Sequence, residues 1–266
     1  MRRLKKYCSV LGVIIRCSFY QILTYRANFL SGLLTDSCFN LSRVVFVNIL
    51  FLNAEYLGDW SLEHYFIFFG CSFLMESIYM FFFYNSHTLI SRQIHNGNMD
   101  FLLTKPMSEM FTLSVMNVNI GRGLSNFILG MIFLFRGARG IGLKITTGRA
   151  ALLVLFILCG SVIYFSISLI INLLSFWVVK VDTVFDLFLS VTDLYRYPGD
   201  IFPRLISAAI TFVIPLQFIS IIPAKSLLGI AGAGAAFLAI LYSVFFALLS
   251  YGLMRMAAAA YTSAGG

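Results

Sequence analysis

Charged side chains are scarce in this sequence: they make up 11% of its 266 residues, against 60% hydrophobic residues and a mean hydropathy of +0.90. Soluble domains average about 25% charged and about 45–50% apolar residues. A soluble protein of this length could not hide so much apolar surface, because large exposed patches cause association. The same composition excludes a disordered chain. The composition therefore predicts a polytopic membrane protein.

Short alternating segments, which are typical of an outer-membrane barrel and are about ten residues long, are missing. The apolar runs are about twenty residues long instead, which is the length of a membrane-spanning helix. The five cysteines are scattered and form no C-x-x-C pair, so neither a disulfide nor a metal framework is indicated. The fold class that this pattern predicts is an all-α polytopic membrane protein.

Catalytic motifs are missing as well. The sequence contains no H-E-x-x-H, no G-x-S-x-G and no phosphate-binding G-x-x-x-x-G-K-[ST] motif. His64, His87 and His95 do not share a metal-ligand spacing, and we interpret them as residues of span ends or loops. We therefore expect no catalytic residue, metal site or cofactor in this chain. If nucleotide hydrolysis drives the protein, the ATPase is a separate chain.

Residues 1–29 predict an amphipathic helix at the membrane interface. Helical spacing places Lys5 and Arg16 on a polar stripe, and Leu11 and Ile15 on an apolar stripe. A helix with these two faces lies on the membrane and leads into the first span.

Residues 30–266 predict a transmembrane domain of six helices. Their expected bounds are 30–52, 62–84, 110–135, 150–176, 205–222 and 227–254. Most Lys and Arg residues then fall on the same side as both termini, and the positive-inside rule assigns that side to the cytoplasm. The basic loop at residues 136–149 falls on the outer side and is an exception to this bias.

Four ionisable residues fall well inside the predicted spans, away from the span ends, namely Asp36, Arg43, Glu76 and Arg122. A charge at the centre of a membrane helix costs about 2.5–3.5 kcal/mol on insertion scales, so we expect all four to face protein or water. Helical spacing places Asp36, Asn40 and Arg43 on one face of the first span. Folding the first two spans back on each other brings Arg43 and Glu76 to depths that differ by roughly 7 Å. Two interpretations stay open: the polar lining of a translocation path, and a network of ion pairs that locks helices together.

Residues 94–106, IHNGNMDFLLTKP, resemble the I-x-x-G-x-[LM]-D-x-x-L-x-[KR]-P stretch of the ABC type-2 transporter permeases, in their branch of short, six-span bacterial proteins. The resemblance continues in the same order at YPGDIFP (197–203), FVIP (212–215) and the tail YTSAG (261–265). It therefore covers most of the chain.

The resemblance implies the permease subunit of an ATP-binding-cassette exporter in the bacterial inner membrane. In that family, two permease subunits, identical or related, join two cytoplasmic ATPase subunits, which bind ATP and Mg²⁺. The loop between the second and third spans touches the ATPase. Carried onto residues 92–109 of this sequence, the expected ATPase-coupling residues are Asn96, Gly97, Asp100, Phe101, Leu102, Leu103, Lys105 and Pro106.

The residues of this loop fit such a role by themselves. Gly97 and Pro106 are breakers at the two ends of a short helix, and protruding Phe and Leu side chains suit a cleft on a soluble partner. The alternative is an ordinary amphipathic loop lying on lipid. For the whole chain, the alternative function is an ion-coupled secondary carrier or channel in which Asp36 and Glu76 are protonated during transport.

Overall fold

The computed structural model describes residues 2–177, 203 and 215–261. Within these ranges the chain is helical, and the sole β pairing is one isolated bridge between Leu57 and Trp60. Five of the described helices are long and apolar enough to cross a membrane, or six if two helices joined by a sharp bend count as one span. The prediction of an all-helical polytopic membrane protein is therefore confirmed.

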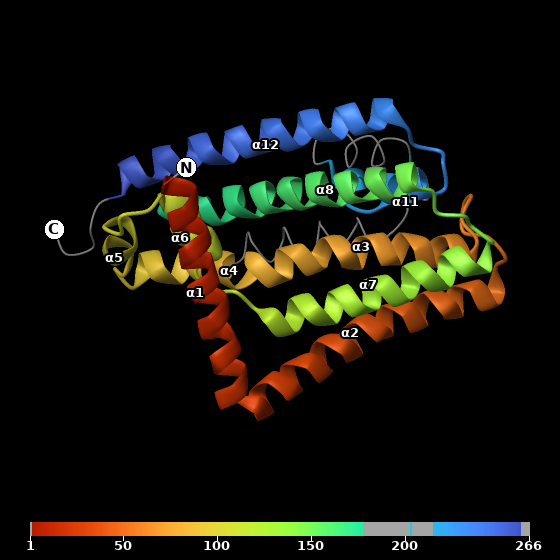
Figure 1. Cartoon of the computed structure of the whole chain (residues 1–266), viewed down its shortest axis with the longest axis horizontal. Helices are drawn as coiled ribbons and strands as arrows, with labels where there is room; N and C mark the ends of the chain where they lie inside the picture. The colour runs from red at the N-terminus through yellow and green to blue at the C-terminus, as the bar shows by residue number, and fades with distance from the viewer. Residues whose placement is uncertain (1, 178–202, 204–214, 262–266) are drawn as a thin grey trace.

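Long helices lie roughly side by side and form a row (Figure 1). In spatial order they are α2 (Arg26–Asn53), α7 (Ile120–Gly140), α3 (Leu62–Phe82), α8 (Thr147–Leu173) and α12 (Ala233–Ala260), and each packs against the next. The row includes α7, which counts as a span only together with α6 (Glu109–Val115), and leaves out α1 (Arg2–Thr24), which is one of the five helices counted above. The central helix α3 is mostly buried, whereas α2 and α12 at the two edges are mostly exposed. Most of the exposed side chains of α2 and α12 are large and apolar, which suits contact with lipid acyl chains.

The first helix, α1 (Arg2–Thr24), breaks from α2 at Tyr25 and runs steeply across one end of the row (Figure 1). Near its start, Lys6 Nζ donates a hydrogen bond to the Pro106 carbonyl at 2.7 Å. The backbone N–H of Ser108 donates to the hydroxyl of Tyr7 at 3.0 Å. The N-terminal helix is thus joined at one end to the segment between the second and third predicted spans.

The third predicted span, 110–135, differs from the observed helices. The chain forms α6 (Glu109–Val115) and α7, which meet at an angle of 72°. Asn119 begins α7 as its N-cap, because its side-chain oxygen accepts the backbone N–H of Arg122 at 3.1 Å. Because both pieces are apolar, hydropathy alone does not reveal the break between them.

The last two predicted spans also need correction. The described part of the span predicted at 205–222 is a 3₁₀ turn, η5 (Leu216–Phe218), followed by α11 (Ile221–Leu227); residues 205–214 lie outside the described residues. The span predicted at 227–254 begins later, because Gly229 adopts a φ of +83° and separates α11 from α12. A φ in this range is readily adopted by glycine and ends a helix.

Glycines on α7 allow it to approach α3 closely. Gly123, Gly130 and Gly137 recur every seven residues and face α3, as expected for the seam of two helices that coil around each other. A Cβ at Gly137 would lie 2.6 Å from the backbone oxygen of Glu63, and one at Gly130 would lie 3.0 Å from the backbone nitrogen of Leu74. The two backbones are therefore too close for any side chain between them.

Gly137→Ala is expected to destabilise the protein, although alanine normally stabilises a helix by about 0.5–1 kcal/mol relative to glycine. The new methyl group meets backbone atoms of Glu63 and Ile67, which cannot move without separating the helices. We expect a net loss of about 1 kcal/mol, or a fall in melting temperature of about 2–4 °C in one detergent. Gly252→Ala on α12 is the control, because nothing lies within 4 Å of its Cβ position. Equal melting temperatures for both variants would contradict this account of the α3–α7 contact.

Candidate functional site

Polar side chains join α2 to α7 within the row. The Asp36 carboxylate lies 3.0 Å from Nε of Arg122, and Nδ2 of Asn40 donates to Oδ1 of Asn126 at 3.2 Å. Asn40 and Asn126 are buried. Because buried polar groups are costly unless they are paired, these contacts hold the two helices in one register.

A second ion pair continues this contact toward α3. Nη1 of Arg43 lies 3.9 Å from Oε1 of the buried Glu76, and it donates to Oδ1 of Asn40 at 3.3 Å. The guanidinium of Arg43 also lies over the ring of Phe39, 4.3 Å from its centroid. On the other side, the guanidinium of Arg122 lies 5.0 Å from the ring centroid of Tyr84. Each arginine therefore has both a carboxylate and an aromatic face beside it.

The structure brings together all five residues that the sequence singled out inside the spans, as two ion pairs that are linked through Asn40. We refer to the whole set as the polar seam: Asp36, Ser37, Asn40, Arg43, Glu76, Arg122, Ser125 and Asn126. Ser125 and Asn126 were not predicted from the sequence, although they follow Arg122 by three and four residues and so share its helix face. The Ser37 and Ser125 hydroxyls are 3.3 Å apart. The seam carries two positive and two negative groups and has no net formal charge.

Another buried polar cluster connects α4 (Tyr84–His95) to α8. Nδ1 of His87 lies 2.9 Å from the Ser168 hydroxyl, which also bonds to the hydroxyl of Tyr79. His87 lies just beyond the predicted end of the second span, in a helix and not in a loop, and its side chain is fully buried. Burial lowers the pKa of His87 to about 3, so the ring is neutral at physiological pH. No group of three potential metal ligands occurs in the part of the chain that the structure describes.

The predicted coupling segment forms a short helix, α5 (Met99–Leu103), after a turn at Gly97, where φ is +70°. Phe101 is 74% exposed, whereas Leu102 is 7% exposed and Met99 is fully buried. The expectation of protruding Phe and Leu side chains thus holds for Phe101 and not for Leu102. The side chain of Leu103 lies outside the described residues.

The other predicted coupling residues surround this helix. Asn96, Lys105 and Pro106 are exposed, and Asp100 is half-buried. Tyr261, just after α12, packs edge-on against Phe176 with ring centroids 5.9 Å apart. Burial and the neighbouring Asp100 carboxylate raise the pKa of Tyr261. The end of α12 therefore lies beside α5.

The two ion-pair partners Arg43 and Glu76 are expected to depend on each other. Arg43→Met leaves the Glu76 carboxylate buried without its arginine, which costs about 3–5 kcal/mol for a buried pair. The double variant Arg43→Met with Glu76→Met removes both charges and is expected to recover most of that loss. Unfolding of the single and the double variant in the same detergent measures both losses of stability.

Asn48→Ala is the control for the Arg43 variant, because the Asn48 amide bonds only to the Val44 carbonyl of its own helix among the contacts described, at 2.8 Å. We expect Asn48→Ala to cause only a small loss of stability. A double variant whose destabilisation equals the sum of the two single losses would show that the pair is not coupled.

Comparison with known proteins identifies the family of this chain. Residues 39–265 match the family described as ABC-2 family transporter protein. No curated protein and no solved structure matches the chain significantly. The match begins within α2 and includes every later helix, so it agrees with the several apolar spans of the row. The chain therefore belongs to the ABC-2 family of transporter proteins, as a multi-pass membrane component of such a transporter.

Proposed function

We propose that this chain is the permease subunit of an ATP-binding-cassette exporter, which forms the substrate path with a second permease subunit, identical or related. Separate cytoplasmic ATPase subunits, which bind ATP and Mg²⁺, drive it. One observation carries the coupling role: Phe101 is 74% exposed on a helix that Met99 and Leu102, both buried, hold inside the bundle. An exposed aromatic side chain on a rigid base is a suitable anchor for a cleft on a partner.

The packing around α5 explains how force at Phe101 reaches the spans. Met99 and Leu102 belong to one buried cluster with side chains from four other helices. These side chains are Ile90 of α4, Leu113 of α6, Leu169 and Leu173 of α8, and Met254 of α12. Because packed interiors transmit displacement, a movement of α5 is expected to tilt α8 and α12 together.

We propose that this end of the row faces the cytoplasm. The α5 helix, the start of α1 and the end of α12 lie at one end of the molecule, and the loop at residues 141–146 lies at the other (Figure 1). Both termini are then inside, as the Lys and Arg distribution predicts. The exposed α1 lies along the inner interface of a bacterial inner membrane, with residues 30–266 forming the transmembrane domain.

Single cysteines test this orientation. In a variant without the native cysteines, Thr104→Cys is expected to react with a membrane-impermeant maleimide only after the membrane is opened. Ile145→Cys, which is 39% exposed at the opposite end, is expected to react in intact cells. The reverse labelling pattern would place α5 outside and exclude its contact with a cytoplasmic ATPase.

Phe101→Ala and Asp100→Lys are expected to weaken association with the ATPase without affecting membrane insertion. Loss of a buried aromatic anchor typically costs more than 2 kcal/mol, which is at least about 30-fold in affinity. Co-purification of the ATPase with the tagged permease measures the effect. Tyr56→Ala is the matched control, because Tyr56 is a 63% exposed aromatic residue of the connection between α2 and α3, which lies at the end opposite α5 (Figure 1). Normal co-purification of both α5 variants would reject the coupling role.

The alternative of an ion-coupled carrier has less support from the polar seam. Asp36 and Glu76 each lie beside an arginine of another helix, at 3.0 and 3.9 Å, which is the arrangement expected of ion pairs that lock helices together. Transport by the purified chain in liposomes, under an ion gradient and without ATP or an ATPase, would support the carrier instead.

A further inference from the structure

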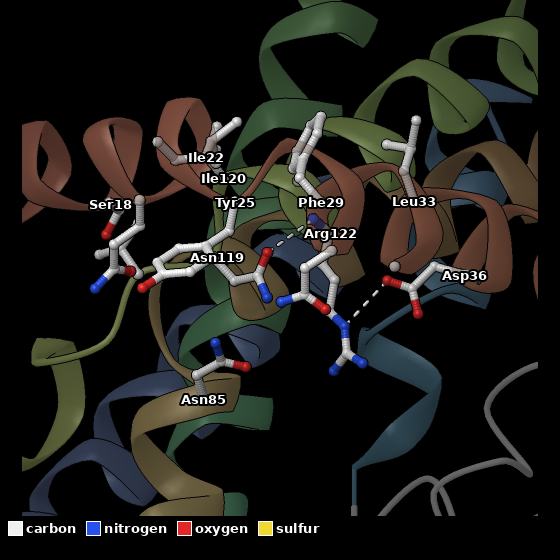
Figure 2. Close-up of a pocket in the computed structure, with 15 residues that line it drawn as sticks. Ser18, Ile22, Tyr25, Phe29, Leu33, Asp36, Asn85, Asn119, Ile120 and Arg122 are labelled. Atoms are coloured by element: carbon white, nitrogen blue, oxygen red, sulfur yellow. Dashed lines mark hydrogen bonds and ion pairs between the residues drawn. The ribbon is translucent and has the colours of Figure 1, made fainter.

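A polar cavity of about 390 Å³ lies where α1, α2, α4 and the start of α7 meet (Figure 2). This volume falls within the usual range for small-molecule sites, about 300–1,000 Å³. Asn85 of α4 faces it from one side, and Tyr25 and Asn119 face it from the other. The α1 and α2 walls precede residue 39, where the family match begins, so they are a feature of this chain outside that match.

Carboxamides dominate the polar lining of this cavity. Gln21, Asn28, Asn85 and Asn119 all contribute to it, together with the hydroxyls of Ser18 and Tyr25. The side-chain amides of Gln21, Asn28 and Asn85 form no hydrogen bond with another residue that the structure describes. Each amide group offers two N–H donors and one oxygen acceptor. Several donors and acceptors therefore line the same space, with Asn85 and Asn119 pointing into it, and are available to a ligand.

The charges in the cavity wall favour an uncharged ligand. Asp36 and Arg122 are the charged residues that line it, and they pair with each other at 3.0 Å. A phosphate or carboxylate group needs an excess of cationic donors, and an ammonium group needs carboxylates. A hydroxyl both donates and accepts, as a carboxamide does, so a group with several adjacent hydroxyls matches this lining.

The position of the cavity indicates that its ligand also has an apolar part. From the start of α2 to Asp36 the helix rises about 15 Å, which is half the thickness of a bilayer core. Phe29, Leu33 and Ile120 lie beside the amides. A second cavity of about 440 Å³ shares Ser18 and Asn85 with the first and continues beneath α1 along several apolar side chains. Polar and apolar subsites are thus continuous at this end of the row.

We propose that this cavity binds the uncharged, polyhydroxylated headgroup of an amphiphile in the inner leaflet, with the acyl chain along α1 and α2. The proposal rests on the permease function and the inward orientation given above, and it assigns the cavity as the entry site for the substrate. The amides bind the hydroxyls, Tyr25 offers a ring face to the headgroup, and the Asp36–Arg122 pair forms the inner wall.

Fluorescence quenching in nanodiscs tests this assignment without ATP or an ATPase. Tyr25→Trp places a reporter in the wall, and the unsubstituted chain corrects for Trp60 and Trp177. The probe is glucosyl diacylglycerol with brominated acyl chains, compared with equally brominated phosphatidylcholine and phosphatidylglycerol at the same mole fraction. We expect about a tenfold preference for the glucosyl lipid, which corresponds to about 1.4 kcal/mol.

Asn28→Leu with Asn85→Leu, made in the reporter chain, is expected to abolish the preference while leaving the melting temperature and the oligomeric mass unchanged. Asn48→Leu is the matched control on α2, because the Asn48 amide bonds its own helix, and it is expected to retain the preference. Equal quenching by all three lipids, stronger quenching by phosphatidylglycerol, or loss of the oligomer in the double variant would each overturn the proposal. Because the ATPase is absent, a negative result leaves the coupling role of Phe101 standing.

Discussion

The constraint on which this structure depends is that lipid gives helices no hydrophobic reason to associate, since acyl chains are as apolar as leucine. Association then relies on close backbone contact and on polar pairs. This protein uses both on a single helix. One face of α7 presents Gly123, Gly130 and Gly137 to α3, and another presents Arg122 and Asn126 to α2. Within the row, α7 is therefore the helix that joins α2 to α3.

The same constraint shapes the end of the row that carries α5. Asn119 ends the connection to α6 and begins α7 at an angle of 72°, so that α7 starts beside Tyr84 at the start of α4. The polar seam stops at the Asp36–Arg122 pair, and the amide-lined cavity begins there. The Asp36–Arg122 pair thus lies at the end of the packed part of the bundle and forms one wall of the cavity. The α5 helix lies at this same end, where its buried side chains contact α8 and α12.

Several features of the fold could be predicted from sequence because they depend on composition and period alone. The scarcity of charge and the twenty-residue apolar runs predicted an all-helical membrane protein, and helical spacing placed Asp36, Asn40 and Arg43 on one face. The order of motifs indicated the transporter family that residues 39–265 match. In contrast, the span predicted at 110–135 was misplaced, because hydropathy does not detect a helix cap such as Asn119 between the apolar helices α6 and α7.

The sequence by itself determined that four charges must be removed from lipid, since the transfer cost of a charge depends on the residue and its depth. Only the tertiary structure decided which charges pair, because Arg122 meets Asp36 through contacts between segments far apart in the chain. It also decided that Leu102 is buried while Phe101 is exposed, because burial depends on the neighbours that folding supplies. The amides of Gln21, Asn28 and Asn85 are unremarkable in the sequence, and they form a site only because three helices bring them to one cavity.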